Sequence, residues 1–563
     1  MRRLPLTLGL VLALACSALP PLAQAAVGPA SAPTTGNVLV LVSRGAVAAA
    51  ARSSVRAVVA RMHARPAGRS VPEIGLITVR PPAGVSVTAL AAALGRLPGV
   101  ASATPERRYV PRLTPNDPAL SAFDPSSGAG QWTLERENFP SAWNLSRGNG
   151  ALVGVVDTGV DASHPDLSGK IAAAVDQQDP SDARGTASTD EVGHGTHVAS
   201  LACADTNNGL GMAGAGYNCK LVVEKSDFSD SSIAAAIVDA ANRHVDALNM
   251  SFGPSTPTTT PAPESEVLAL RYAAAHNVVL VAAAADTPGT EQGDPANVLQ
   301  PAGTGPSLSQ GLGLDVTAAD YSAHRASFAG SGSEISLAAF GAFQPEAGGG
   351  LLGLGASGPV PGIFGAYPAG PTDLEAQFCG CRTTFTGSSS YAYLQGTSMA
   401  APQVTATAAM MRVLNPFATV SDVITTLKRT ASRPAGTGWT SDLGWGILDA
   451  GAALDAVRRI DRLAPVSRLA APSVARRRVF LLRWVGHDQR PPELIASGIA
   501  HYDIYARTAG GRTRRIASTT RHSLRFHGRA GERYVFFAVA VDRAGNRQAR
   551  PVNATTRVAR GAR

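Results

Sequence analysis

The stretch GTSMAAP at residues 396–402 surrounds one hydroxyl, that of Ser398, with small residues, directly before the helical pattern VTATAAMMRVL. This arrangement is typical of a nucleophile at the start of a helix. Serine is a weak nucleophile at its ordinary pKa, so the role requires a neighbouring base and a third group that holds the base in place. The chain must therefore provide two further side chains for Ser398.

Two upstream motifs contain suitable side chains. In VGVVDTGVD (residues 153–161) a β-branched run ends at Asp157, as expected at the carboxyl end of a buried strand. In GHGTHVAS (193–200) glycines on both sides of His194 permit close backbone approach, and the following residues have a helical pattern. Each motif alone also fits a strand end, a solvated turn or an ordinary helix start. The chain order Asp157, His194, Ser398 is much harder to obtain by chance.

Together these motifs resemble those of the subtilisin-like serine peptidases, the subtilases, whose catalytic residues follow the order Asp, His, Ser. The resemblance extends from about residue 116 to residue 457. It implies that Ser398 is the nucleophile and His194 the general base and acid. Asp157 then orients and stabilises the imidazole. Because the family uses the first histidine of HGTH, we expect His197 to be a packed helix residue.

The same resemblance assigns the substrate-binding stretch. In NMSFG, the residues Ser251, Phe252 and Gly253 match the segment that pairs with extended substrate through backbone hydrogen bonds. A buried structural strand is the alternative. At the position of the family's oxyanion-binding asparagine this chain has Asp286, preceded by Ala285 in place of glycine. The extra methyl group lies near the pocket for the residue that precedes the scissile bond.

Asp286 is the main departure from the family pattern, because an ionised carboxylate cannot donate a hydrogen bond to an oxyanion. Loss of one such donor costs about 100- to 1000-fold in turnover. Three interpretations remain open. The carboxyl is protonated and donates, since burial raises a carboxyl pKa; it is ionised and the enzyme is slow; or the chain is a degenerate binding protein.

The region between the motifs alternates strand and helix patterns: KLVVE, SSIAAAIVDAANRH, VDALNMSFG, ESEVLALRYAAAHN and VVLVAAAAD. This alternation predicts βαβ units and a parallel sheet covered on both faces. Asp157, Ser251 and Asp286 follow strand ends, so one cleft at the carboxyl edge of the sheet would contain all three. The predicted fold class is α/β: a subtilisin-like parallel sheet flanked by helices, preceded by a small α+β propeptide and followed by an all-β sandwich.

The first 25 residues have two arginines, an apolar run and an Ala-Gln-Ala ending, and predict a signal peptide. Residues 26–112 have a strand-helix-strand-helix-strand pattern that resembles the subtilase propeptide. The resemblance implies an inhibitor and folding aid that docks on the enzyme until cleavage near Arg112-Leu113. The net charge is +8 over residues 37–111 and −16 over 112–463, which favours docking. No later stretch reaches the roughly 20 apolar residues of a transmembrane segment.

Five cysteines are present, and Cys16 lies inside the predicted signal peptide. The remaining four form an even number in an exported chain, which favours disulfides. Cys203 and Cys219 are predicted to form a local bridge. Cys379 and Cys381 either close a tight ring or pair elsewhere. A metal site from these four lacks a further histidine or cysteine at the usual spacing, so none is predicted.

No cofactor requirement is expected. Family members often bind structural calcium, but no acidic loop of this sequence stands out as the site. The segment EAGGGLLGLGASGPVPGIFGAYPAG (346–370) is rich in glycine and proline without a period, and it predicts a surface loop.

Residues 464–563 contain twenty arginines and no lysine and have a net charge of +15. Short alternating runs separated by turns predict an antiparallel β-sandwich of about seven strands, and YVFFAVAVDRAGN resembles fibronectin type III-like domains. Such a basic domain would bind an anionic cell-surface polymer or pack on the chain's own acidic peptidase domain. Nucleic acid is disfavoured, because the aromatic residues alternate as in a core and form no stacking motif.

The sequence therefore predicts a secreted, extracellular or cell-surface serine endopeptidase that is made as a zymogen, with a peptidase domain over residues 113–463. The alternative is a catalytically weak or inactive subtilase-fold protein that binds surfaces.

Overall fold

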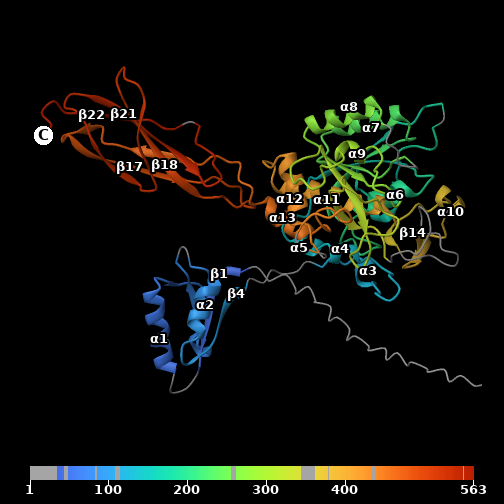
Figure 1. Ribbon diagram of the computed structural model, residues 1–563, viewed down its shortest axis with the longest axis horizontal. Helices are drawn as coiled ribbons and strands as arrows, with labels where there is room; N and C mark the ends of the chain where they lie inside the picture. Colours follow the sequence, from blue (N-terminus) through green and yellow to red (C-terminus); the bar gives the residue numbers. More distant parts are fainter. Residues whose placement is uncertain are drawn as a thin grey trace, which may run out of the picture. The chain divides into compact units, whose positions relative to one another are not determined.

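The computed structural model contains two compact units, residues 1–111 and 112–563, which are described one at a time (Figure 1). The predicted signal peptide and the predicted cleavage site at Arg112-Leu113 lie outside the described residues. The structure describes residues 34–43, 48–82, 85–107, 114–181, 183–254, 261–343, 362–377, 379–433, 436, 438–549 and 551–563.

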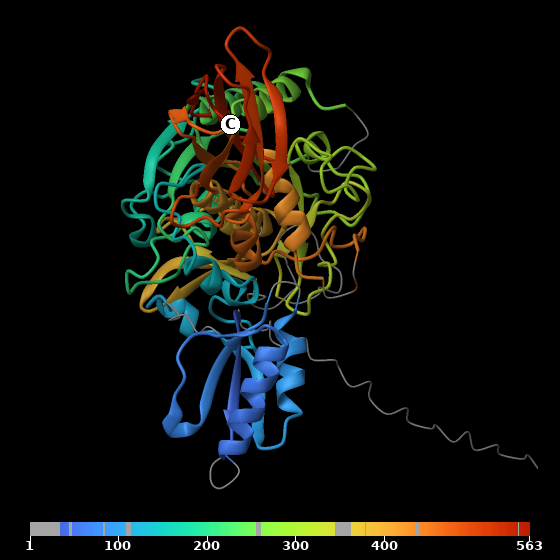
Figure 2. The ribbon, with the colours of Figure 1, turned by 90° about the vertical axis from the view of Figure 1, so that its left-hand side faces the viewer.

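The first unit is a small α+β domain with the predicted strand and helix order, extended by one short strand. Its antiparallel sheet has the strand order β2-β3-β1-β4, and Figure 2 shows its helices packed beside the sheet. Val38 and Val40 alternate along the first strand into a core with Val55 and Leu90 from the helices. The elements are β1 (Thr34–Val42), α1 (Ala48–Arg61), β2 (Arg65–Pro66), a 3-10 turn (Pro72–Ile74), β3 (Leu76–Arg80), α2 (Val87–Gly95) and β4 (Val100–Arg107).

The second unit contains a seven-stranded parallel sheet with the order β11-β10-β9-β8-β5-β7-β6. The predicted parallel sheet flanked by helices is confirmed. Its strands are β5 (Leu152–Asp157), β6 (Ile171–Asp176), β7 (Lys220–Lys225), β8 (Ala247–Met250), β9 (Val279–Ala283), β10 (Leu314–Ala319) and β11 (Leu337–Phe340).

Helices cover both faces of this sheet, because the strands are apolar on both sides. Val153 and Val155 of β5 face one core, whereas Val156 faces the other. The first core includes helix α6 (His194–Cys203) and the central helix α11 (Thr397–Leu414). The second includes α7 (Asp230–Asn242) and α8 (Glu264–Ala275), which lie side by side in Figure 1. The other helical elements are α3 (Pro118–Ser121), α4 (Thr133–Arg136), α5 (Phe139–Trp143), a 3-10 turn (Pro165–Leu167), α9 (Ala296–Leu299), α10 (Asp373–Gln377), α12 (Val420–Thr430) and α13 (Ala450–Val457).

A small antiparallel sheet, β12-β14-β13, corrects one prediction. Its strands are β12 (Ile363–Ala366), β13 (Arg382–Phe385) and β14 (Ser388–Leu394). Of the predicted surface loop 346–370, residues 346–361 lie outside the described part, but β12 is a fully buried strand. It is buried because it pairs with β14 and its Gly365 lies against His197: a Cβ at Gly365 would lie 2.4 Å from His197 Nε2.

The described part of the chain contains two disulfides. Cys203 at the end of α6 is bonded to Cys219 just before β7, with a Cα–Cα distance of 5.6 Å, as predicted. Cys379 is bonded to Cys381, so of the two alternatives for this pair the tight ring is the one observed.

The C-terminal residues form two sheets, with strand orders β15-β17-β20 and β16-β22-β21-β18-β19. Trp484 and Phe536 are buried between them. The described part of this domain has eight strands where about seven were predicted, because the two-residue edge strand β16 is added by parallel pairing with β22. The strands are β15 (Val466–Ala470), β16 (Val474–Ala475), β17 (Val479–His487), β18 (Ile499–Thr508), β19 (Arg514–Thr519), β20 (Ser523–His527), β21 (Arg533–Asp542) and β22 (Ala554–Val558). No helix in the described part of the chain combines the length and apolar character that crossing a membrane requires.

Candidate active site

A cavity of about 580 Å³ opens where the carboxyl ends of β8 and β9 approach the start of α11. Six of the residues predicted from the sequence line it: His194, Ser251, Phe252, Gly253, Asp286 and Ser398. Asp157 ends β5 and is fully buried behind His194. The fold therefore gathers at one sheet edge residues that lie far apart in the chain.

Asp157 and His194 are hydrogen-bonded: His194 Nδ1 donates to Asp157 Oδ1 at 2.8 Å. The Thr158 N–H donates to the same oxygen and fixes the carboxylate. Burial alone would lower the pKa of His194, but the charge and hydrogen bond of Asp157, with the nearby charges of Asp190 and Asp286, outweigh it and raise that pKa. The imidazole is thus held with Nδ1 engaged and is a stronger base than a free histidine.

Ser398 is the second residue of α11 and lies in the same cavity as His194. Its hydroxyl donates to the Ser251 carbonyl at 3.3 Å, and the Ser251 hydroxyl donates to the Ser398 carbonyl at 3.0 Å. Asn249 donates to the Ser251 hydroxyl and accepts from Thr405 of α11. This chain of bonds fixes the helix start against β8. Among the described hydrogen bonds none joins Ser398 to His194.

Asp190 is a site residue that the sequence reasoning missed. Its buried carboxylate accepts hydrogen bonds from the Thr158 hydroxyl and from the Gly193 and Thr196 N–H groups, at 2.7 to 2.8 Å. These bonds tie the residues after Asp157 to the first turn of α6. The available signal was an acidic residue shortly before a helix start, which is typical of a cap. Asp190 therefore positions His194 without facing the cavity.

Asp286 has one carboxylate oxygen occupied. Oδ1 accepts from both the N–H and the hydroxyl of Thr397, each at 2.8 Å. Burial raises the pKa of Asp286 to about 6, against the lowering effect of these bonds and of the His194 charge. The neutral form would place its proton on Oδ2, because Oδ1 is an acceptor here.

Two further side chains near the site differ in role. His197 is fully buried and its Nε2 donates to the Ile363 carbonyl at 3.0 Å. Burial, with the charge of His194, lowers its pKa to about 3, so it is the packed residue expected. Gln395 lines the cavity and is 6% exposed, and within the described ranges neither of its side-chain polar atoms has a hydrogen-bond partner. No sequence pattern singles out Gln395, because its position in the cavity depends on the fold.

A profile of the Subtilase family matches residues 148–446. The chain belongs to this family. The match includes the predicted triad and the whole stretch from β5 to the turn before α13. This subtilase is accordingly a subtilisin-like serine endopeptidase.

Several known proteases are similar to this chain. Thermitase from Thermoactinomyces vulgaris is 29% identical over 332 residues, covering 58% of this subtilase and 94% of thermitase. An extracellular protease from Xanthomonas campestris pv. campestris is 28% identical over 402 residues, covering 64% of this chain and 60% of that one. A solved protease structure from Pseudoalteromonas arctica aligns at 29% identity with a TM-score of 0.47, covering 61% of this chain and 100% of that one.

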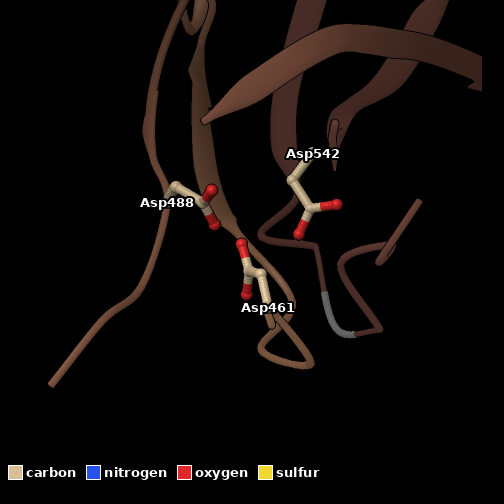
Figure 3. Close-up of side chains that lie close together, drawn as sticks. All are labelled: Asp461, Asp488 and Asp542. Atoms are coloured by element: carbon tan, nitrogen blue, oxygen red, sulfur yellow. The ribbon is translucent and has the colours of Figure 1, made fainter. Parts of the chain in front are cut away.

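One acidic cluster bears on the expectation of calcium. Asp461, Asp488 and Asp542 each place a carboxylate oxygen within 4.8 Å of the other two (Figure 3). Oxygen ligands of this kind suit Ca²⁺. However, neighbouring donors in residues 463–546 already bond to all of these carboxylate oxygens except Asp488 Oδ1. The cluster is therefore a hydrogen-bonded junction, and calcium is not assigned to it.

Proposed function

We propose that Ser398, His194 and Asp157 are the catalytic residues of this endopeptidase. The observation that carries the proposal is the 2.8 Å bond between His194 and Asp157 beside a cavity that also contains the Ser398 hydroxyl. With Nδ1 bonded to Asp157, Nε2 of His194 is the nitrogen that takes the Ser398 proton as the hydroxyl attacks a peptide carbonyl. His194 then returns the proton to the leaving amine. Water hydrolyses the resulting acyl-enzyme by the reverse sequence.

The proposal extends to the oxyanion. The N–H of Ser398 at the start of α11 and a protonated Asp286 would donate to the developing negative charge. A pKa of about 6 supports this role, because a large fraction of Asp286 is then neutral in mildly acidic solution. The backbone of Ser251, Phe252 and Gly253 would pair with the extended substrate.

Labelling with a fluorophosphonate tests the catalytic assignment, because only an activated serine reacts. The wild-type chain should be labelled and should cleave a denatured protein, whereas Ser398→Ala should do neither. His194→Ala should retain the hydroxyl but lose labelling. A folded wild-type chain that resists labelling over pH 5 to 9 would instead favour the inactive surface-binding protein.

The chain organisation is part of the proposal. Residues 1–25 direct export, residues 26–112 act as an inhibitory propeptide, and cleavage near Arg112-Leu113 releases the peptidase domain (113–463) with its β-sandwich (464–563). The Xanthomonas relative is an extracellular protease, which supports secretion. N-terminal sequencing of the mature protein from culture medium should begin within several residues of position 113. Retention of residues 26–112 in the active form would contradict the zymogen.

The +15 charge of residues 464–563 supports attachment to an anionic cell-surface polymer. Many of these arginines are exposed, so a polyanion can reach them. Salt should elute the protein from cells, since screening weakens such binding. If salt leaves cell binding unchanged but expands the purified protein, the basic domain packs on the peptidase domain instead.

A further inference from the structure

The catalytic cavity has an acidic region that the proposed chemistry does not use. Asp230 begins α7, Glu266 lies in the first turn of α8, and Asp294 follows β9; all three line the cavity. Among the described lining residues there is no lysine or arginine. The described salt bridges likewise include none of these three carboxylates. These three carboxyl groups therefore have no salt-bridge partner among the residues that the structure describes.

Glu266 is the buried member of this acidic region. Its side chain is 2% exposed, and Oε1 has no hydrogen-bond partner among the residues that the structure describes. Burial, then the adjacent carboxylates of Asp294 and Asp230, raise its pKa to about 8. The carboxyl of Glu266 shares a side-chain hydrogen bond with Asp294, so Oε1 is the oxygen that is buried without a partner. A buried polar atom without a partner is destabilising, and an apolar side chain at this position would pack on the second core without that penalty. A cationic ligand group is what the arrangement lacks.

The surroundings of these carboxylates define the shape of that ligand. Phe228, Ile233 and Phe252 form an apolar wall in the same cavity, with the two phenylalanine ring centroids 5.3 Å apart. Exposure increases from the buried Glu266 through the half-buried Asp294 to the exposed Asp230 at the rim. A long side chain with an apolar stem and a cationic head matches this gradient.

We propose that Glu266, Asp294 and Asp230 form a specificity subsite that binds a basic side chain of the substrate, arginine in preference to lysine. The inference rests on the proposed function, because Phe252 belongs both to the apolar wall and to the backbone segment 251–253 assigned to substrate pairing. A peptide strand along that segment would direct one side chain toward the wall, since alternate side chains share a face. A guanidinium has donors in a planar fork and can bond to two carboxylates at once, which an ammonium does less well.

The test scans arginine through six positions around the scissile bond of a fluorogenic peptide and compares it with citrulline, a neutral analogue of the same length. At one position arginine should raise kcat/KM at least about 30-fold over citrulline, the range for a desolvated charge pair. Glu266→Gln and Asp294→Asn should reduce that preference while cleavage of the citrulline peptide continues. Glu264→Gln removes the same charge from the exposed side of α8 and should leave the preference intact.

Two outcomes would overturn the subsite: no position with an arginine preference, or a preference that Glu266→Gln and Asp294→Asn leave unchanged. Binding to the Ser398→Ala protein separates this inference from the proposed function. Fluorescence anisotropy of the labelled arginine and citrulline peptides should show the same preference without hydrolysis. If the wild-type chain cleaves no peptide while Ser398→Ala still binds the arginine peptide more tightly, the proposed catalysis is wrong and the subsite stands. If the wild-type chain cleaves peptides without an arginine preference, the catalysis stands and the subsite is wrong.

Discussion

Replacing Asp286 with asparagine should convert a proton-dependent oxyanion donor into a permanent one. With a pKa of about 6, about half of the Asp286 carboxyls are neutral at pH 6 and about one in a hundred at pH 8. If the neutral form is the donor, the ratio of kcat for Asp286→Asn to that of the wild type is about 2 at pH 6 and about 10 at pH 7. At higher pH this kcat ratio should level off at about 100- to 1000-fold, which is the contribution of one oxyanion donor to turnover.

The assay is kcat for a neutral fluorogenic peptide from pH 5 to pH 9, with Glu264→Gln as the control for loss of one acidic residue. The ratio of the two kcat values removes most of the pH dependence caused by the titration of His194, because both proteins contain this histidine. Because the Asp286 charge helps to raise the pKa of His194, the acidic limb of the profile should also shift to lower pH in Asp286→Asn. A ratio that stays constant from pH 6 to pH 9 would refute the donor role of Asp286.

Three other predictions follow from buried groups. Replacing Cys203 and Cys219 with serine opens a bridge between residues 16 apart and should lower the free energy of unfolding by about 3 kcal/mol in urea denaturation. Asp190→Asn places an amide N–H donor against the N–H groups that Asp190 now accepts from, so His194 loses its support. We expect kcat to fall about tenfold or more with KM nearly unchanged. An unaltered kcat would show that His194 is positioned without Asp190. In the β-sandwich, burial would raise the pKa of Asp503, but hydrogen bonds from neighbouring side chains, including Arg547, lower it. That stabilisation is present above the unfolded-state pKa of about 3.9 and is lost as the pH falls through the lower folded-state pKa. Asp503→Asn should therefore lower the free energy of unfolding by about 1 to 3 kcal/mol at pH 7 and by less at pH 3. Urea denaturation at the two pH values measures this difference.

The parts of the fold that the sequence predicts are those with local patterns. The run of valines that ends at Asp157 is β5, because consecutive β-branched residues suit a strand buried on both faces. The helical pattern after His194 is α6. The strand β12 was missed because its residues 363–366 lie in a segment whose glycines and prolines indicate a loop. Its burial depends on pairing with β14, almost thirty residues later. The local composition does not predict that pairing.

Part of the cleft was predictable because it is formed by strand ends, which local patterns indicate. Strand ends of a parallel sheet meet at one edge, so the sequence alone places Asp157, Ser251 and Asp286 together. Glu266 and Asp294 could not. Glu266 occupies an amphipathic helix where an acidic residue is ordinary, and Asp294 lies in a segment without a pattern. Only the packing of α8 beside the end of β9 brings their carboxylates into one cavity.

The contact between Gly365 and His197 joins two positions 168 residues apart in the chain. Any side chain at 365 would collide with the imidazole, so a homologue with alanine or serine there must carry a smaller residue than histidine at 197. Substitutions at the two positions should therefore occur as correlated pairs during the evolution of this protein's lineage. An alignment of its orthologues can detect that covariation. The covarying pair would then locate β12 even where the surrounding glycine-rich sequence has diverged.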